Sequence, residues 1–153
     1  MMTIKIVKEA PNTVEAIQLI DELEATLAPH YPDESRHGYS VDKLIKQGVH
    51  FFVARQSDSP VACGGVQFFG TDYAELKRMY VRPEYRGMGL SKLLLKHLAD
   101  YSFEHGITVL RLETGIHQLA AIGLYEGFGF QRVEPFGDYK PDPLALFFEK
   151  KLG

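Results

Sequence analysis

Cysteine is nearly absent from this chain, in which Cys63 is the only one. One thiol excludes an intramolecular disulfide framework and a zinc site built from cysteines. Cys63 lies in the apolar, glycine-rich stretch 61–69, where a small buried side chain is a commoner role than a nucleophile. We therefore expect Cys63 to be a packing residue of the core.

The chain also lacks long apolar runs and a strong net charge. No apolar run approaches the length that crosses a membrane, and residues 3–8 alternate in polarity instead of forming the core of a signal peptide. The formal net charge is −3, which gives no general attraction to nucleic acid or to an anionic membrane surface. The default expectation is a cytoplasmic protein without a nucleic-acid or membrane partner, in which any phosphate site is local.

The composition that remains is that of an ordinary globular protein, with 45% hydrophobic and 24% charged residues. For 153 residues we expect a single domain, 1–153, that buries roughly two thirds of its unfolded surface.

Polarity patterns divide the chain into strands and helices. Alternation or short apolar runs predict strands at 3–8, 50–55, 61–69, 73–81, 107–113, 130–133 and 144–149. Apolar residues at three-to-four spacing predict helices at 13–27, 40–47, 118–126 and from residue 90 to about 105. Asn12 or Thr13 can cap the first of these helices, and Ser40 can cap the second. Short links between 50 and 81 indicate an antiparallel meander, and the strand–helix–strand order over 73–113 implies one parallel pairing. The predicted fold class is α/β, a single mixed, mostly antiparallel sheet flanked by helices.

Two irregular segments, 28–39 and 134–143, interrupt this pattern with prolines, aromatic residues and polar residues. Long connections in compact domains often form binding sites, although a flexible surface loop fits the same composition. His30 and His37 have no third ligand at a recognisable spacing, so we expect no metal.

The turn between the strand at 73–81 and the following helix is suited to an anion. The first N–H groups of a helix have no partner within the helix, and the positive end of its dipole points the same way. Arg86 adds a guanidinium group that can bind phosphate with two donors, and Gly87 and Gly89 allow a ligand to approach the backbone. We expect a pyrophosphate here, although a plain turn with a solvated arginine fits the same residues.

Two common nucleotide-binding motifs do not fit this turn. A P-loop ends in Gly-Lys-Ser/Thr, whereas Ser91 and Lys92 stand in the opposite order. A dinucleotide fingerprint requires a third glycine three residues after Gly89, where this chain has Lys92.

Two separate segments together resemble the GCN5-related N-acetyltransferase (GNAT) family. The segment 86–91, Arg-Gly-Met-Gly-Leu-Ser, is similar to the family's phosphate-binding motif Arg/Gln-x-x-Gly-x-Gly/Ala, except that Ser91 stands where the motif ends in glycine or alanine. The segment 120–130, Ala-Ala-Ile-Gly-Leu-Tyr-Glu-Gly-Phe-Gly-Phe, resembles the second signature, Ala-x-x-Leu-Tyr-x-x-x-Gly-Phe. Many relatives carry an asparagine just before this helix, whereas residues 115–118 here are Gly-Ile-His-Gln. The order of elements over 3–150 agrees, so the resemblance implies the GNAT fold.

The resemblance implies that the pyrophosphate belongs to acetyl-coenzyme A (acetyl-CoA), the acetyl donor and co-substrate, and it implies no metal. In the family the pantetheine arm pairs with the end of the strand before the motif like an added strand. A backbone N–H of this strand can also bind the thioester oxygen and stabilise the oxyanion. The expected cofactor-binding residues are Met79, Tyr80, Val81, Arg86, Gly87, Met88, Gly89, Leu90 and Ser91.

Acetyl transfer to an amine requires a base for the amine and is helped by an acid for the departing thiolate. Tyr125 matches the family tyrosine near the coenzyme sulfur, and a phenol is protonated at neutral pH; a core aromatic is the other interpretation. Glu75 is the candidate base, because many family members carry one at this place in the strand. Two-residue alternation puts Glu75 on one face of the strand with Lys77, Met79 and Val81. A solvent-exposed glutamate with no catalytic role would show the same pattern.

Glu113 is the rival base, since it ends the next strand, where sites of α/β sheets gather. A simple ion pair with Arg111 or Arg78 is the other interpretation of Glu113. Water is the third candidate for the base.

The acceptor pocket is expected at the two irregular segments. Arg36 offers a pair of donors that matches a carboxylate, and solvated loop residues are the alternative for every member of this set. The candidate substrate residues are Arg36, His37, Tyr39, Glu113 and Tyr139.

The leading hypothesis is acetyl transfer from the thioester to a primary amine of a small molecule or amino acid, by direct attack in a ternary complex. Acetylation of a protein N-terminus or lysine, and a coenzyme A-binding regulatory module without turnover, are the alternatives. The resemblance also allows a homodimer, which no sequence feature decides.

Overall fold

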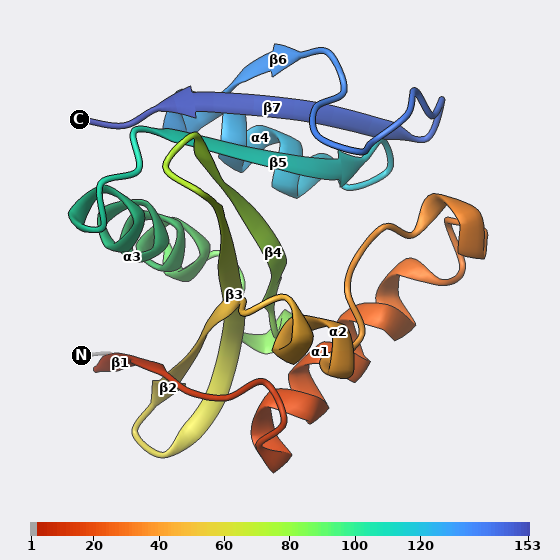
Figure 1. Ribbon diagram of the computed structural model, residues 1–153. Helices are drawn as coiled ribbons and strands as arrows, with labels where there is room; N and C mark the ends of the chain where they lie inside the picture. The colour runs from red at the N-terminus through yellow and green to blue at the C-terminus, as the bar shows by residue number, and fades with distance from the viewer. Residues whose placement is uncertain (1–2) are drawn as a thin grey trace.

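The computed structural model describes residues 3–153, which form a seven-stranded sheet with helices on both faces (Figure 1). The strands are β1 (Ile4–Lys8), β2 (His50–Gln56), β3 (Ser59–Phe69), β4 (Tyr73–Val81), β5 (Val109–Gly115), β6 (Gln131–Val133) and β7 (Ala145–Lys151). The helices are α1 (Val14–Leu27), α2 (Val41–Lys46), α3 (Leu90–Glu104) and α4 (Leu119–Phe128), with single 3₁₀ turns η1 (Asp33–Ser35) and η2 (Pro83–Tyr85).

The strand order is β1-β2-β3-β4-β5-β7-β6. β4 and β5 are parallel, and every other neighbouring pair is antiparallel. This confirms the predicted mixed sheet, its meander and its one parallel pairing. The place of β7 between β5 and β6 was not predicted, because β7 follows β6 in the chain.

Side-chain caps begin two of the helices where the sequence predicts them. Thr13 Oγ1 accepts a hydrogen bond of 3.2 Å from Ala16 N at the start of α1, and Ser40 Oγ accepts one of 3.2 Å from Lys43 N at the start of α2. The strand expected from residue 107 begins only at Val109, because the backbone N–H of Ile107 donates to Ser102 and completes the end of α3.

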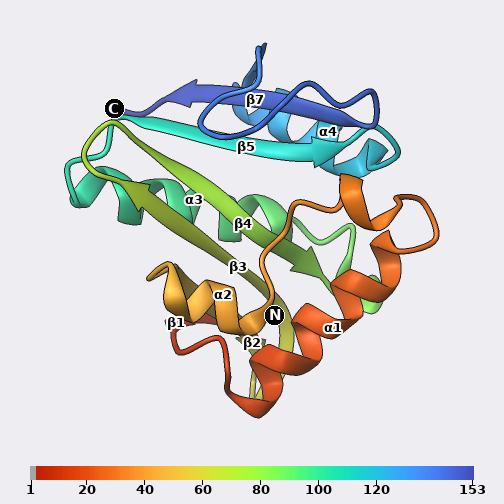
Figure 2. The same cartoon turned by 45° about the vertical axis from the view of Figure 1, so that its right-hand side comes forward.

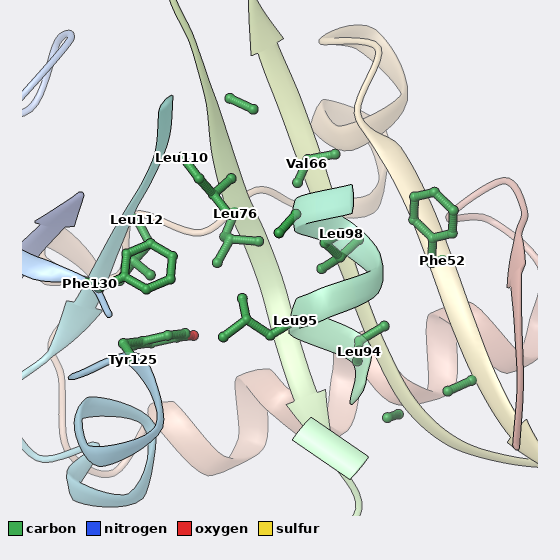
Figure 3. Packing of buried hydrophobic residues seen from close by; sticks show 14 of the residues in the cluster. Phe52, Val66, Leu76, Leu94, Leu95, Leu98, Leu110, Leu112, Tyr125 and Phe130 are labelled. Carbon is green, nitrogen blue, oxygen red and sulfur yellow. The ribbon is translucent and has the colours of Figure 1, made fainter. Parts of the chain in front are cut away.

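Two apolar layers cover the sheet. On one face, α3 and α4 pack onto the middle strands, and Leu95 and Leu98 of α3 lie near Leu76 and Val66 (Figure 3). On the other face, α1 and α2 pack over the cluster that contains Cys63, which is completely buried as predicted. Burial raises the pKa of this thiol to about 12.

A third, smaller cluster fastens the segment 134–143 to β7. Phe136 packs with Phe147, and Tyr139 and Tyr73 lie against them. This contact carries Tyr139 to the face of the sheet on which the candidate site lies. Within residues 3–153, no helix is long and apolar enough to cross a membrane.

Candidate active site

The turn after β4 has the backbone geometry of an anion site. Gly87 and Gly89 have φ angles of 79° and 77°, a region that glycine adopts without strain. A Cβ at either position would meet no atom within 4 Å, so conformation rather than space requires glycine. Gly89 is the N-cap of α3 and offers no side chain to the first amides of the helix. Arg86 is exposed beside them, and its Nε donates to the Val81 carbonyl at 3.0 Å.

The other expected cofactor residues divide into exposed and buried side chains. Met88 is exposed and Ser91 is half-buried, so both side chains are accessible at the start of α3. Tyr80 is buried, and its hydroxyl donates to Glu22 of α1 at 3.1 Å. Val81 and Leu90 belong to the apolar core. Contacts between these buried residues and a cofactor are therefore limited to the backbone.

The strands β4 and β5 pair at only two positions and then separate. Ala74 pairs with Leu110 and Glu75 with Arg111, after which the two strands diverge (Figure 2). A pocket occupies this split. Its walls are residues 75–79 of β4, 112–115 of β5 and 35–38 of the first irregular segment, with Leu23, Leu27, Tyr31, Gln118, Ala121, Tyr125 and Tyr139.

A β-bulge interrupts β4 inside this pocket. Cys63 of β3 pairs with Tyr80, and Gly65 pairs with Lys77, so β4 has two residues where β3 has one. Arg78, in the bulge, has a φ of 56°, which is uncommon for a residue with a side chain.

The bulge changes which residues share a face. Met79 and Val81 pack with Leu76 in the core beneath α3, whereas Glu75 and Lys77 face the pocket and Tyr139. The prediction from alternation, which put all four on one face, is therefore wrong for Met79 and Val81. A bulge adds one residue to the strand and reverses the alternation beyond it.

The side chain of Arg78 ties the bulge to α1 and the first irregular segment. Its Nε donates to the Tyr39 carbonyl at 3.0 Å, and its guanidinium group pairs with Glu24. A Cβ at Gly38 would overlap the same guanidinium group. A larger residue at this position would therefore displace the guanidinium group from its contacts.

Glu75, the candidate base, lies in the pocket wall with its Oε2 atom already engaged. The side chain is 3% exposed, the Tyr139 hydroxyl donates to Oε2 at 2.6 Å, and Lys77 Nζ lies 2.9 Å from the same atom. Burial lowers the pKa of Lys77, and the charge of Glu75 opposes that effect. Burial and the Glu75 charge together raise the pKa of Tyr139, so its phenol is protonated at neutral pH.

Glu113 lies across the split and is paired with a histidine. Its Oε2 atom is 2.8 Å from Nδ1 of His37, and its side chain is 14% exposed. Burial raises the pKa of the Glu113 carboxyl, and the hydrogen bond to His37 opposes it. Nε2 of the same imidazole lies 3.8 Å from Oδ2 of Asp142. The alternative interpretation of Glu113, an ion pair with Arg111 or Arg78, is not found, because Arg111 binds Glu149 at 2.8 Å and Arg78 binds Glu24.

Arg36 lines the pocket but is held by neighbouring oxygens. Its Nη1 donates to the Tyr31 carbonyl at 2.7 Å, its Nε lies 3.4 Å from Glu24, and its Nη2 pairs with Asp33. Tyr39 covers Lys77, whose Nζ is 3.9 Å from the ring centroid. These contacts give Arg36 and Tyr39 structural partners within the chain.

Tyr125, the candidate acid, reaches the pocket from α4. Its ring is 6% exposed and packs in the core against Phe130, with the hydroxyl directed toward Leu95 and β4 (Figure 3). Burial raises the pKa of the phenol, which is therefore protonated at neutral pH. Tyr125 is therefore a core aromatic residue that also lines the pocket, and this position is compatible with a role as the acid.

The acetyltransferase (GNAT) family model matches residues 16–130 of this chain. The chain belongs to this family. The IAA acetyltransferase of Azospirillum brasilense is 40% identical over 153 residues, which cover 99% of this chain and 100% of the relative. The uncharacterized N-acetyltransferase YsnE of Bacillus subtilis is 33% identical over 140 residues, which cover 90% of this chain and 93% of the relative.

Solved GNAT structures share the fold over the whole chain. A Klebsiella pneumoniae protein described as an acyl-CoA N-acyltransferase has a TM-score of 0.83 and 36% identity, covering 100% of this chain and 99% of that one. PaiA N-acetyltransferase from Thermoplasma acidophilum, solved in complex with coenzyme A, has a TM-score of 0.75 and 23% identity, covering 98% and 99% of the two chains. The predicted family, enzyme class and fold are thereby confirmed.

Three residues of this GNAT site were not singled out from the sequence as site residues. Lys77 stands two residues after Glu75 on a strand, a spacing that indicates a shared face. Asp142 and Tyr31 gave no such signal, because their contacts join distant segments. The Tyr31 hydroxyl accepts a hydrogen bond of 2.9 Å from His117 N, and its ring occupies the space a Cβ would need at Gly115. Within residues 3–153, no three His, Cys, Asp or Glu residues form a group that could hold a metal.

Proposed function

We propose that residues 1–153 are one N-acetyltransferase domain that transfers the acetyl group of acetyl-CoA to a primary amine of a small molecule or amino acid. The observation that carries this proposal is the pocket in the split between β4 and β5, where Glu75 and Glu113 on opposite strands and Tyr125 on α4 line one space. Acyl transfer to an amine requires a proton acceptor and benefits from a proton donor, and this pocket contains residues of both kinds.

The turn 86–91 supports binding of the cofactor's pyrophosphate. Gly87 and Gly89 open the backbone to a ligand, and Arg86 is exposed beside the start of α3. A pantetheine arm extended from this turn along β4 would bring the thioester to the bulge at Arg78. Since a bulge leaves one residue out of the strand ladder, we expect a backbone N–H of 78–79 to bind the thioester oxygen.

Direct attack by the amine follows from the side chains that are present. Cys63, the only thiol, is completely buried on the face covered by α1 and has a pKa raised to about 12, so it does not carry the acetyl group. The amine and the thioester would therefore occupy the pocket together, in a ternary complex.

Two measurements test this function. Acetyl-CoA at about 100 times its Kd should raise the unfolding free energy by about 2.7 kcal/mol and raise the Tm. A panel of amines, amino acids and peptides should then release free thiol from acetyl-CoA, with small amines or amino acids reacting fastest. Absence of stabilisation would exclude the cofactor site. Stabilisation without thiol release from any acceptor would instead support the regulatory alternative, and preference for peptides would support protein acetylation.

A further inference from the structure

We propose that Glu113 takes the proton from the attacking amine and that His37 passes it on toward Asp142 and solvent. This inference rests on the proposed acetyl transfer and deepens it by naming the base and the route by which the proton leaves. It concerns two segments that are 76 residues apart in the sequence and meet only in the folded chain.

The two pocket carboxylates differ in what already binds them. Oε2 of Glu75 accepts the hydrogen bond of Tyr139 and contacts the ammonium group of Lys77, and this side chain is 3% exposed. The side chain of Glu113 is 14% exposed, and within residues 3–153 its one hydrogen-bond partner is His37. An amine proton would have to displace one of these two partners to reach Oε2 of Glu75, whereas Glu113 is the more exposed of the two carboxylates. Glu113 is therefore the better base.

His37 lies between the inner pocket and an outer groove. The inner pocket contains Glu113 and Tyr125, and the groove is formed by residues 138–144 with Pro32 and Glu34; His37 lines both. Its Nδ1 atom faces Glu113 at 2.8 Å and its Nε2 atom faces Asp142 at 3.8 Å. An imidazole with one nitrogen on each side can accept a proton at the first and release one at the second.

Each proton has a defined place in the reaction. The acceptor enters as an ammonium ion, the Glu113 carboxylate removes one N–H proton, and the freed lone pair forms the C–N bond to the thioester carbon. Glu113 then protonates Nδ1 of His37, and Nε2 releases its proton toward Asp142 and water. When the C–S bond breaks, Tyr125 protonates the sulfur and regains a proton from the new amide nitrogen. One proton is released per turnover, and Glu113 and Tyr125 return to their starting states. The imidazole is left with its proton on Nδ1, and it regains the Nε2–H tautomer by proton exchange with water before the next turnover.

Several other charged or titratable groups influence Glu113 and His37. Lys77 and Glu75 on β4 act on Glu113 with opposite signs, and the Tyr139 ring meets His37 edge-on at 5.5 Å. Because the His37 hydrogen bond lowers the pKa of Glu113, its removal should raise that pKa further. A change at His37 should therefore move the pH dependence of the reaction and not only its rate.

The pH dependence of kcat/KM with an active amine tests the relay. Glu113→Gln should lower kcat about 100-fold or more and abolish the acidic limb of the profile. His37→Ala should lower kcat, move the acidic limb to higher pH and regain activity when imidazole is added. Glu75→Gln should lower kcat less than Glu113→Gln and retain an acidic limb. His105→Ala, at the exposed end of α3, should match the parent enzyme.

Two results would overturn the relay while leaving acetyl transfer intact. One is an unchanged rate and profile for Glu113→Gln; the other is loss of the acidic limb in Glu75→Gln instead. A measurement without turnover is NMR of the His37 side chain, whose Nδ1 resonance should move when Glu113→Gln removes the carboxylate that lies 2.8 Å away. An unchanged Nδ1 resonance would also refute the relay. If the parent acetylates no amine at all, the proposed function fails, and the relay fails with it.

Discussion

The phenol of Tyr139 donates a hydrogen bond of 2.6 Å to Oε2 of Glu75, and this bond joins the segment 134–143 to the buried middle of β4. Lys77 contacts both members, at 2.9 Å from Glu75 Oε2 and 3.2 Å from the Tyr139 hydroxyl. The three side chains form a compact polar cluster on the wall of the pocket. Their mutual contacts give hydrogen-bond partners to three polar groups that are removed from water, a carboxylate, an ammonium group and a phenol.

Tyr139→Phe should destabilise the fold, because it removes a hydrogen bond to a charged, buried acceptor. We expect a loss of about 1.5–3 kcal/mol in the free energy of unfolding, measured by urea denaturation at pH 7. Tyr73→Phe is the matched control, since Tyr73 packs in the same cluster and forms no side-chain hydrogen bond among residues 3–153. Equal stability losses in the two variants would mean that the bond to Glu75 contributes nothing.

Glu22 links α1 to the strand end that precedes the cofactor turn. The hydrogen bonds of Arg82 hold the pKa of the Glu22 carboxyl below its usual range. In the unfolded chain this carboxyl has its usual, higher pKa of about 4.5. Its contribution to the free energy of unfolding is therefore fully present above that pH and is lost as the pH falls through the lower pKa of the folded chain. Urea denaturation from pH 7 to pH 3 should show less acid sensitivity for Glu22→Gln than for the parent. Glu126→Gln, at an exposed position of α4, should keep the parent's dependence.

Local sequence signals predicted much of this fold but not the pairing of distant side chains. Thr13 and Ser40 cap their helices where predicted, because capping depends only on residues three or four positions away. The glycines of the cofactor turn were also recognisable. The bulge at Arg78 could not be recognised in the same way, because the residue with the positive φ angle is not a glycine. The contacts of its side chain with Glu24 and the Tyr39 carbonyl join segments that are distant in the sequence.

The same limit applies to the candidate site. Glu75 was singled out by the family resemblance, and Glu113 by its place at the end of the next strand. The cation beside Glu75 is Lys77 of the same strand, but the other partners, Tyr139 and His37, come from the segments 134–143 and 28–39, whose course no periodic pattern describes. The alternative in which Glu113 pairs with an arginine is therefore not what the fold contains, and the contact with His37 appears only in the folded chain.

Gly87→Ala tests whether the turn after β4 requires its left-handed backbone. An alanine at a φ of 79° costs about 1–2 kcal/mol, and relief of that strain would displace the amides proposed to bind the pyrophosphate. We expect acetyl-CoA to bind about tenfold more weakly, measured by calorimetry.

Gly123→Ala is the matched control for Gly87→Ala, because Gly123 lies within α4 with no atom within 4 Å of an added Cβ. That change should stabilise the protein by about 0.5–1 kcal/mol and leave binding unchanged. Full acetyl-CoA affinity in Gly87→Ala would exclude this turn as the pyrophosphate site.

Tyr125→Phe separates the two roles of this residue, since it keeps the ring and removes the hydroxyl. The ring supplies packing in the core with Phe130, so stability should change little. The raised pKa keeps the phenol protonated at neutral pH, as an acid for the departing thiolate requires. We expect kcat to fall about 100-fold, measured by thiol release with a saturating amine.

Tyr101→Phe is the control for Tyr125→Phe and should give the opposite pattern, because the Tyr101 hydroxyl lies 3.1 Å from His50, away from the pocket. It should lose about 1 kcal/mol of stability and keep the parent kcat. If Tyr125→Phe turns over as fast as the parent with every active amine, the hydroxyl is not the acid, and water must protonate the sulfur instead.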